Sequence, residues 1–170
     1  MKKKCHWKMT RHALENRGGA CKRFWIKLGS IMPDILVYTY KRGHLFGTTQ
    51  ERTVRTLSKL ERKKRWSFVS CYRFGYVLHY LEDYFTFPHN VKGHLLEHCR
   101  YEKLFQNKLD GMLDGSQLRC SPSPLPIQEW LEARHREYLQ FAKDIETDFL
   151  YISQTISEII LRMEQKFSRI

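Results

Sequence analysis

The stretch that decides the fold spans residues 66–85 and reads WSFVSCYRFGYVLHYLEDYF. Apolar residues lie on nearly every side of this segment when it is wound as a helix, which is the pattern of a helix covered by its neighbours. Pro88 follows shortly afterwards and cannot continue a helix, so it marks the end. We therefore predict a single multi-helix domain over residues 1–170, built around a central buried helix at about 66–85.

The apolar residues outside this stretch mostly recur at spacings of three and four, and the alternation typical of strands is scarce. The fold class that we expect is therefore all-α. Residues 111–126 are loop-like in composition, with two glycines, three prolines and three serines, and they separate residues 1–110 from a helical tail at 127–170. The other expected helices lie at about 6–15, 21–28, 34–41, 50–61 and 94–109, and from 127 through 138 to 167 with a bend in the middle.

Composition and charge narrow the classes of function. Thirty Lys and Arg against 18 Asp and Glu give a formal charge of +12, which favours an anionic partner such as nucleic acid, a phosphate-bearing substrate or an acidic lipid surface. The five cysteines form no C-x-x-C pair, which argues against a zinc finger, a redox motif and a disulfide framework.

No apolar run approaches the roughly 20 residues of a membrane span, and the early lysines precede no apolar signal core. We expect a cytoplasmic protein that could still contact a membrane peripherally.

Seven basic residues crowd the segment 52–65. Three interpretations are open for it: a solvated helix face, a docking surface for an anionic membrane, and a contact with nucleic acid. The role of the aromatic residues in and after the central helix is open too, because they could line an apolar groove, stack on bases or belong to the core. These aromatic residues are Tyr80, Tyr84, Phe85 and Phe87.

Histidines and carboxylates recur at ligand spacing within residues 79–102. His79 and Asp83 are four residues apart on the central helix, so both side chains leave the same face about one turn apart. His98 and Glu102 repeat this spacing on the next predicted helix, and His89 lies between the two pairs. Such groups suit a zinc-like metal, which would also satisfy polar side chains that are costly to bury. The alternative is that each pair is an ordinary hydrogen bond or salt bridge.

Three further histidines are weaker candidates. His94 precedes His98 by four residues and faces the same side of its helix, so it could add a ligand. His12 is expected at the surface or in the core, and His135, which lies in a charged run of the tail, is expected to be solvated.

The segment 74–90, FGYVLHYLEDYFTFPHN, resembles the motif of the zinc-dependent phospholipase C family, whose metal-site plan is shared by fungal-type single-strand nucleases. The resemblance covers about residues 4–105, and the tail is similar only as generic helix. It implies an all-α fold that holds a cluster of two to three zinc ions. One implied zinc is held by Asp34, His44, His79 and Asp83, with Asp83 bridging, and another by His89, His98 and Glu102.

The resemblance also implies a third zinc, and for its ligands this sequence departs from the family's pattern. Secreted members of the family bind it through the amino terminus of the mature chain, an early histidine and the bridging aspartate. His6 is the early histidine here, and a free Met1 amine could take the place of the processed terminus.

Zinc with nitrogen and oxygen ligands performs no redox chemistry, so the expected reaction is hydrolysis. A metal cluster activates water near neutral pH and neutralises phosphoryl oxygens, and Asp34 is the residue expected to orient or deprotonate that water. By resemblance, the substrate is a phospholipid, cleaved to diacylglycerol and a phosphorylated headgroup. Two alternatives remain: a single-strand nuclease or nucleotidase with the same metals, and a non-catalytic basic binding protein. The sequence does not determine the oligomeric state.

Overall fold

The computed structural model describes residues 1–36, 45–91, 95–115, 122–142 and 144–168. These residues form helices joined by turns, and no strand occurs among them, which confirms the predicted all-α class. The helices are α1 (Lys3–Ala13), α2 (Ala20–Ile31), α4 (Phe46–Glu61), α5 (Phe68–Tyr84), α6 (Leu95–Asp114), α7 (Ile127–Phe141) and α8 (Ile145–Ser168), with short 3-10 helices η1 (Met32–Asp34) and η2 (Phe87–His89).

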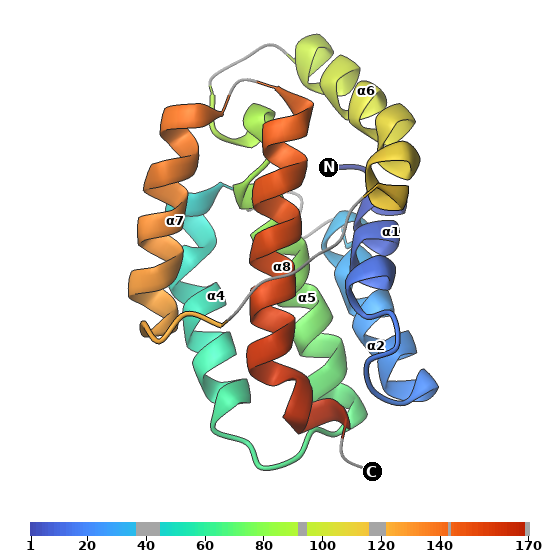
Figure 1. The fold of residues 1–170 in the computed structure, drawn as a ribbon, viewed down its shortest axis with the longest axis vertical. Helices are drawn as coiled ribbons and strands as arrows, with labels where there is room; N and C mark the ends of the chain where they lie inside the picture. Colours follow the sequence, from blue (N-terminus) through green and yellow to red (C-terminus); the bar gives the residue numbers. More distant parts are fainter. Residues whose placement is uncertain (37–44, 92–94, 116–121, 143, 169–170) are drawn as a thin grey trace.

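Helix α5 packs against α1, α2, α4 and α8, and most of its residues are buried (Figure 1). It begins where the Ser67 hydroxyl accepts a hydrogen bond from the backbone N–H of Ser70, a common N-terminal cap. It ends at Tyr84, just before the turn that contains Pro88. Among the four aromatic residues whose role was open, Tyr80, Tyr84 and Phe85 are buried.

Helices α2 and α5 cross so closely that their backbones touch. A Cβ atom added to Gly75 would lie 1.8 Å from the carbonyl oxygen of Ile26, and one added to Gly29 would lie 2.1 Å from that of Tyr72. Only glycine fits at these two positions, because real Cβ atoms do not approach within 3.0 Å. The close approach brings the end of α2 and the η1 turn against the middle of α5, where His79 lies.

The C-terminal tail forms two helices, so the prediction of one bent helix was wrong. Ala142 has extended backbone angles and ends α7, and the Asp144 carboxylate accepts a hydrogen bond from the backbone N–H of Thr147 at 2.7 Å, which caps α8. The predicted apolar face does lie inside along α8, with Ile152, Ile156, Ile159, Met163 and Phe167 all fully buried.

Two other boundaries differ from expectation. Helix α6 continues to Asp114 instead of ending near 109, so part of the predicted loop at 111–126 is helical. Of the helix expected at 34–41, the structure shows only the η1 turn at its start, since residues 37–44 lie outside the described part of the chain. No helix in the described ranges is both long enough and apolar enough to cross a membrane.

His135 is buried, contrary to the expectation that it is solvated. Its ring stacks on Phe46 with the centroids 3.7 Å apart, and its Nε2–H donates to Asn90 Oδ1 at 2.9 Å. Burial lowers the pKa of His135 to about 4, so the ring is neutral at physiological pH. The prediction rested on the charged residues next to His135 in the sequence. In the helix, however, His135 shares its face with the buried residues Leu131 and Tyr138.

Candidate metal centre

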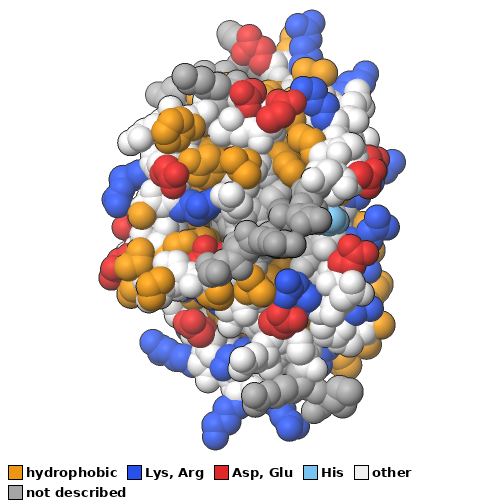
Figure 2. All heavy atoms as spheres, viewed as in Figure 1, with side chains coloured by type: hydrophobic (Ala, Val, Ile, Leu, Met, Phe, Trp, Pro, Cys, Tyr) orange, Lys and Arg blue, Asp and Glu red, His pale blue; other side chains and the backbone are white. Residues whose placement is uncertain are grey.

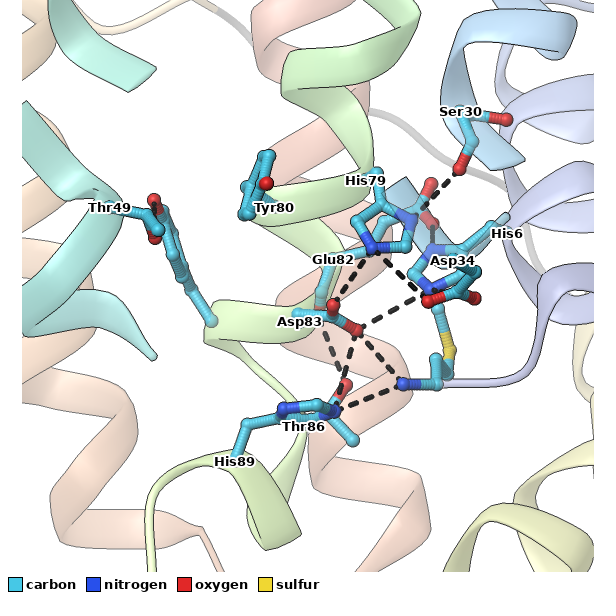
Figure 3. Close-up of polar contacts among 12 residues, drawn as sticks. His6, Ser30, Asp34, Thr49, His79, Tyr80, Glu82, Asp83, Thr86 and His89 are labelled. Atoms are coloured by element: carbon cyan, nitrogen blue, oxygen red, sulfur yellow. Dashed lines mark hydrogen bonds and ion pairs between the residues drawn. The ribbon is translucent and has the colours of Figure 1, made fainter. Parts of the chain in front are cut away.

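Two groups of metal-ligand side chains meet near the C-terminal end of α5, and Figure 3 shows the first group together with Asp83 and His89. The first joins His6 of α1, Asp34 of η1 and His79 of α5, whose ligand atoms all lie within 4.8 Å of one another. The second joins His89 of η2 with His98 and Glu102 of α6, and its ligand atoms satisfy the same limit. The two groups draw on five different elements of the fold.

Asp83 lies between these two groups and is completely buried. Its Oδ2 is 3.1 Å from His79 Nε2, and its Oδ1 is 3.4 Å from His6 Nε2. The same Oδ1 is 3.6 Å from His89 Nε2 in the second group. A carboxylate that reaches both sets of ligands has the arrangement required to bridge two metal ions.

Each imidazole of the first group is held by its other ring nitrogen. His79 Nδ1–H donates to the carbonyl oxygen of Ser30 at 2.9 Å, and His6 Nδ1 is hydrogen-bonded to the Glu82 carboxylate. Both contacts leave Nε2 directed toward Asp34 and Asp83. Metal-binding histidines have this pattern, since a second-shell acceptor selects the tautomer and orients the ring.

The orientation of His6 provides a test of whether a metal fits. His6 Nε2 is buried and has no hydrogen-bond partner in the described structure. It lies 3.4 Å from Asp83 and 3.9 Å from the partly exposed Asp34. Burying a polar nitrogen without a partner is costly, so a cation between this nitrogen and the two carboxylates fits the donor set.

Electrostatics keep His6 and Asp83 in the protonation states that a divalent cation needs. Burial, reinforced by the neighbouring His79, holds the pKa of His6 well below its usual value, so its ring is neutral. Burial alone would raise the pKa of Asp83, but the Met1 amine and the surrounding histidines hold it well below its usual value. A neutral imidazole and an ionised carboxylate are the forms that bind zinc.

The Met1 amine occupies the space between the two groups. It donates to Asp83 Oδ1 at 2.9 Å, and it lies 3.1 Å from His89 Nε2 and 3.2 Å from Glu102 Oε1. Burial lowers the pKa of this amine, but Asp83 and Glu102 outweigh that effect and raise it to about 11. The amine, His6 and Asp83 are the groups that the family resemblance implied for a third zinc, and its binding remains a prediction.

Glu82 lies in this centre, although the sequence analysis did not single it out. It is completely buried, contacts His6 and accepts a hydrogen bond from the Thr10 hydroxyl at 3.2 Å. Burial and the adjacent Asp83 raise its pKa well above the usual value. The sequence could have indicated Glu82, because it is a second carboxylate beside Asp83 on an apolar helix. Such a group must find a partner inside the protein.

Replacing Glu82 with glutamine is expected to weaken zinc binding by about 10- to 100-fold, because an amide can present either its donor or its acceptor to His6 Nδ1 and so fixes the tautomer and the ring less firmly. Competition with a chromophoric chelator measures the affinity. Glu129→Gln, on the exposed side of α7, is the matched control and should bind zinc like the wild type. Equal affinities for the two variants would contradict a role for Glu82 in orienting a ligand.

The C-terminal helices support the second group through Asp148 of α8. This buried carboxylate accepts hydrogen bonds at 2.7 Å from the backbone N–H of Phe87, from the Tyr101 hydroxyl and from the Tyr138 hydroxyl. Phe87 begins η2, which carries His89, and Tyr101 precedes Glu102 on α6. The tail therefore holds in place the elements on which the second group is built.

Most of the candidate ligands predicted from the sequence come together here, while their roles as ligands remain predictions. His6 lies with Asp34 and His79, whereas the resemblance had placed it apart from them at a third metal. His98 Nε2 and Glu102 Oε1 are 3.1 Å apart, as their helical spacing predicted. The predicted ligand His44 and the weaker candidate His94 lie outside the described residues.

These observations define the class: an all-α protein with a buried centre of imidazoles and carboxylates, the ligand types that zinc binds. The family model for zinc-dependent phospholipase C matches residues 5–159, and the chain belongs to that family. The match extends beyond residue 105, where the resemblance of the motif ended, and includes most of the C-terminal helices. Comparison with curated proteins and with solved structures gives no match. Membership implies zinc and supports a zinc-dependent phosphodiesterase.

Proposed function

We propose that this protein is a zinc-dependent hydrolase that cleaves phospholipids to diacylglycerol and a phosphorylated headgroup. The observation that carries the proposal is the buried Asp83 carboxylate, which lies within 3.6 Å of histidines from both ligand groups. Two metal ions on either side of one carboxylate suit phosphodiester hydrolysis, since one can activate water while the other stabilises the leaving oxygen. The family match supports the same reaction class.

The residues of the centre divide into supporting and reacting roles. His6, His79 and Asp83 are completely buried and serve as rigid ligands. Asp34 is 19% exposed, so it is the carboxylate of the first group that can meet both a metal and an incoming water. We assign to Asp34 the orientation or deprotonation of that water. The second group, His89, His98 and Glu102, is partly exposed and is placed to receive a phosphate oxygen or the leaving oxygen.

A single-strand nuclease or nucleotidase with the same metals is the second candidate, because the formal charge of +12 suits a nucleic acid as well as an anionic lipid. Hydrolysis of single-stranded DNA without hydrolysis of phosphatidylcholine would select it. A non-catalytic basic binding protein is the third.

Elemental analysis of the purified, undialysed protein tests the proposal. We expect two to three zinc ions per chain, a lower melting temperature after chelation, and recovery when zinc is added back, because a ligand that binds the native state stabilises it. Assays with monomeric phosphatidylcholine and with single-stranded DNA then decide between the two enzymes. A zinc-free protein whose melting temperature is unchanged by added zinc would contradict the proposal and favour the non-catalytic binding protein.

A further inference from the structure

A basic groove of about 550 Å³ runs between α4 and α5, outside the metal centre. We call it the α4–α5 groove. Among the described residues that line it, four are cationic and none is acidic. The cations are Arg52, Lys59 and Lys63 from α4 and its end, and Arg73 from α5, and all four are exposed. Tyr76 and Tyr80 form part of the groove wall, with the Arg52 guanidinium 6.0 Å from the Tyr76 ring centroid.

Exposed apolar side chains continue from this groove toward the start of α5. Phe68 and Val69 are 49% and 59% exposed, although they begin a helix whose interior is buried. Val69 precedes Arg73 by four residues and so shares its face of the helix. Phe68 stacks with Trp25 of α2 at a centroid distance of 6.1 Å, and the neighbouring Phe24 is 49% exposed.

The groove and the apolar residues border the turn between α4 and α5, which adds further positive charge. Residues 62–65 are all basic and all exposed. Figure 2 shows Lys and Arg side chains at the lower end of the molecule, where Figure 1 places this turn. Cations and apolar side chains thus occupy one surface, which is the combination that binds lipid headgroups and the adjoining acyl region.

We propose that this surface docks the protein onto an anionic phospholipid bilayer: the α4–α5 groove binds the phosphate groups of acidic lipids, and Phe68 and Val69 enter the interface. The inference rests on the proposed function, because it states that the enzyme meets its phospholipid substrate in a bilayer. A purely solvated helix face would not explain the exposed apolar residues beside the cations. A single-stranded nucleic acid would engage the cations and could stack a base on Phe68, but it would leave Val69 without an apolar partner.

The groove also reaches toward the metal centre. Its lining residue Tyr80 follows His79 on α5, and the two ring centroids are 5.6 Å apart. Figure 3 shows Tyr80 beside His79, on the side of α5 that faces Thr49 of α4. A bilayer held at the groove would therefore lie next to the helix that carries His79 and Asp83.

Co-sedimentation with phosphatidylcholine vesicles, with and without phosphatidylglycerol, tests the proposal. We expect the wild-type protein to bind the vesicles with phosphatidylglycerol, and to be released by salt. Each basic side chain near an anionic surface strengthens binding about fivefold, so Lys59→Glu/Arg73→Glu should weaken it by at least about 25-fold. Arg11→Glu/Arg136→Glu changes the net charge equally at exposed sites on α1 and α7, and it should keep most of the binding.

A second variant separates a bilayer from a nucleic acid. Val69→Ser should weaken vesicle binding several-fold and leave any binding of single-stranded DNA unchanged, because an aliphatic side chain enters a bilayer but offers no ring on which a base can stack. The proposal is overturned if phosphatidylglycerol has no effect, or if the two charge variants lose equal affinity. It is also overturned if Lys59→Glu/Arg73→Glu abolishes DNA binding while vesicle binding is absent.

These results are independent of the proposed function, because vesicle binding is measured without turnover. Hydrolysis by the wild type is followed separately on a short-chain phosphatidylcholine kept monomeric, which requires no docking surface. Turnover without charge-dependent vesicle binding would refute the docking surface alone. Vesicle binding without turnover would refute the hydrolase and leave the docking surface standing.

Discussion

Asp83→Asn is expected to lose zinc and hydrolytic activity while the chain still folds. An amide is neutral and offers one oxygen instead of two, so it cannot bridge metals between the histidines of the two groups. Changes in residues that only support a ligand cost 10- to 100-fold in metal affinity, so loss of the bridging ligand should cost at least about a hundredfold. Folding should persist, because the asparagine oxygen can still accept a hydrogen bond from the buried Met1 amine, which also lies 3.2 Å from Glu102 Oε1.

Three measurements on Asp83→Asn check this expectation: zinc per chain by elemental analysis, hydrolysis of phosphatidylcholine, and helical content by circular dichroism. Asp110→Asn is the matched control, since this 67% exposed carboxylate pairs with Lys8 at the surface and contributes little to stability. The control should keep its zinc and its activity. Full activity in Asp83→Asn would refute the assignment of Asp83 as the bridging ligand.

Gly75→Ala is expected to lower the free energy of unfolding by about 3 kcal/mol or more, although alanine is the better helix former by about 1 kcal/mol. The new methyl group would lie 1.8 Å from the Ile26 carbonyl oxygen, so α2 must move away from α5. The same movement would separate the Ser30 carbonyl from His79 Nδ1 and shift the η1 turn that carries Asp34. The variant should therefore bind zinc more weakly as well as unfold more easily.

Urea unfolding of the metal-free proteins measures the first effect, and chelator competition measures the second. Gly111→Ala on α6 is the control, because nothing lies within 4 Å of the added Cβ atom. Removing glycine from an exposed helical position should stabilise this control by up to about 1 kcal/mol. If Gly75→Ala were as stable as the wild type, the close crossing of α2 and α5 could not be what positions His79.

Much of the fold and part of the site followed from local patterns. The apolar segment at 66–85 predicted a helix that the structure shows at Phe68–Tyr84. The spacing of four residues in His79–Asp83 and in His98–Glu102 predicted neighbouring side chains, and each pair lies 3.1 Å apart. Such predictions succeed because helix geometry alone determines which residues share a face. The motif at 74–90 was specific enough to indicate the family.

Contacts between segments far apart in the sequence were decided only by the tertiary structure. No spacing pairs His6 with Glu82, or Asp148 with Phe87 and Tyr101, because these residues meet through the packing of α1 and α8. His135 looked solvated among charged neighbours until its ring was seen stacked on Phe46. The sequence by itself determined the helices and the ligand types. The packing of the helices decided that Nε2 of His6 and of His79 faces the centre, because the groups that hold Nδ1 of these rings come from other helices.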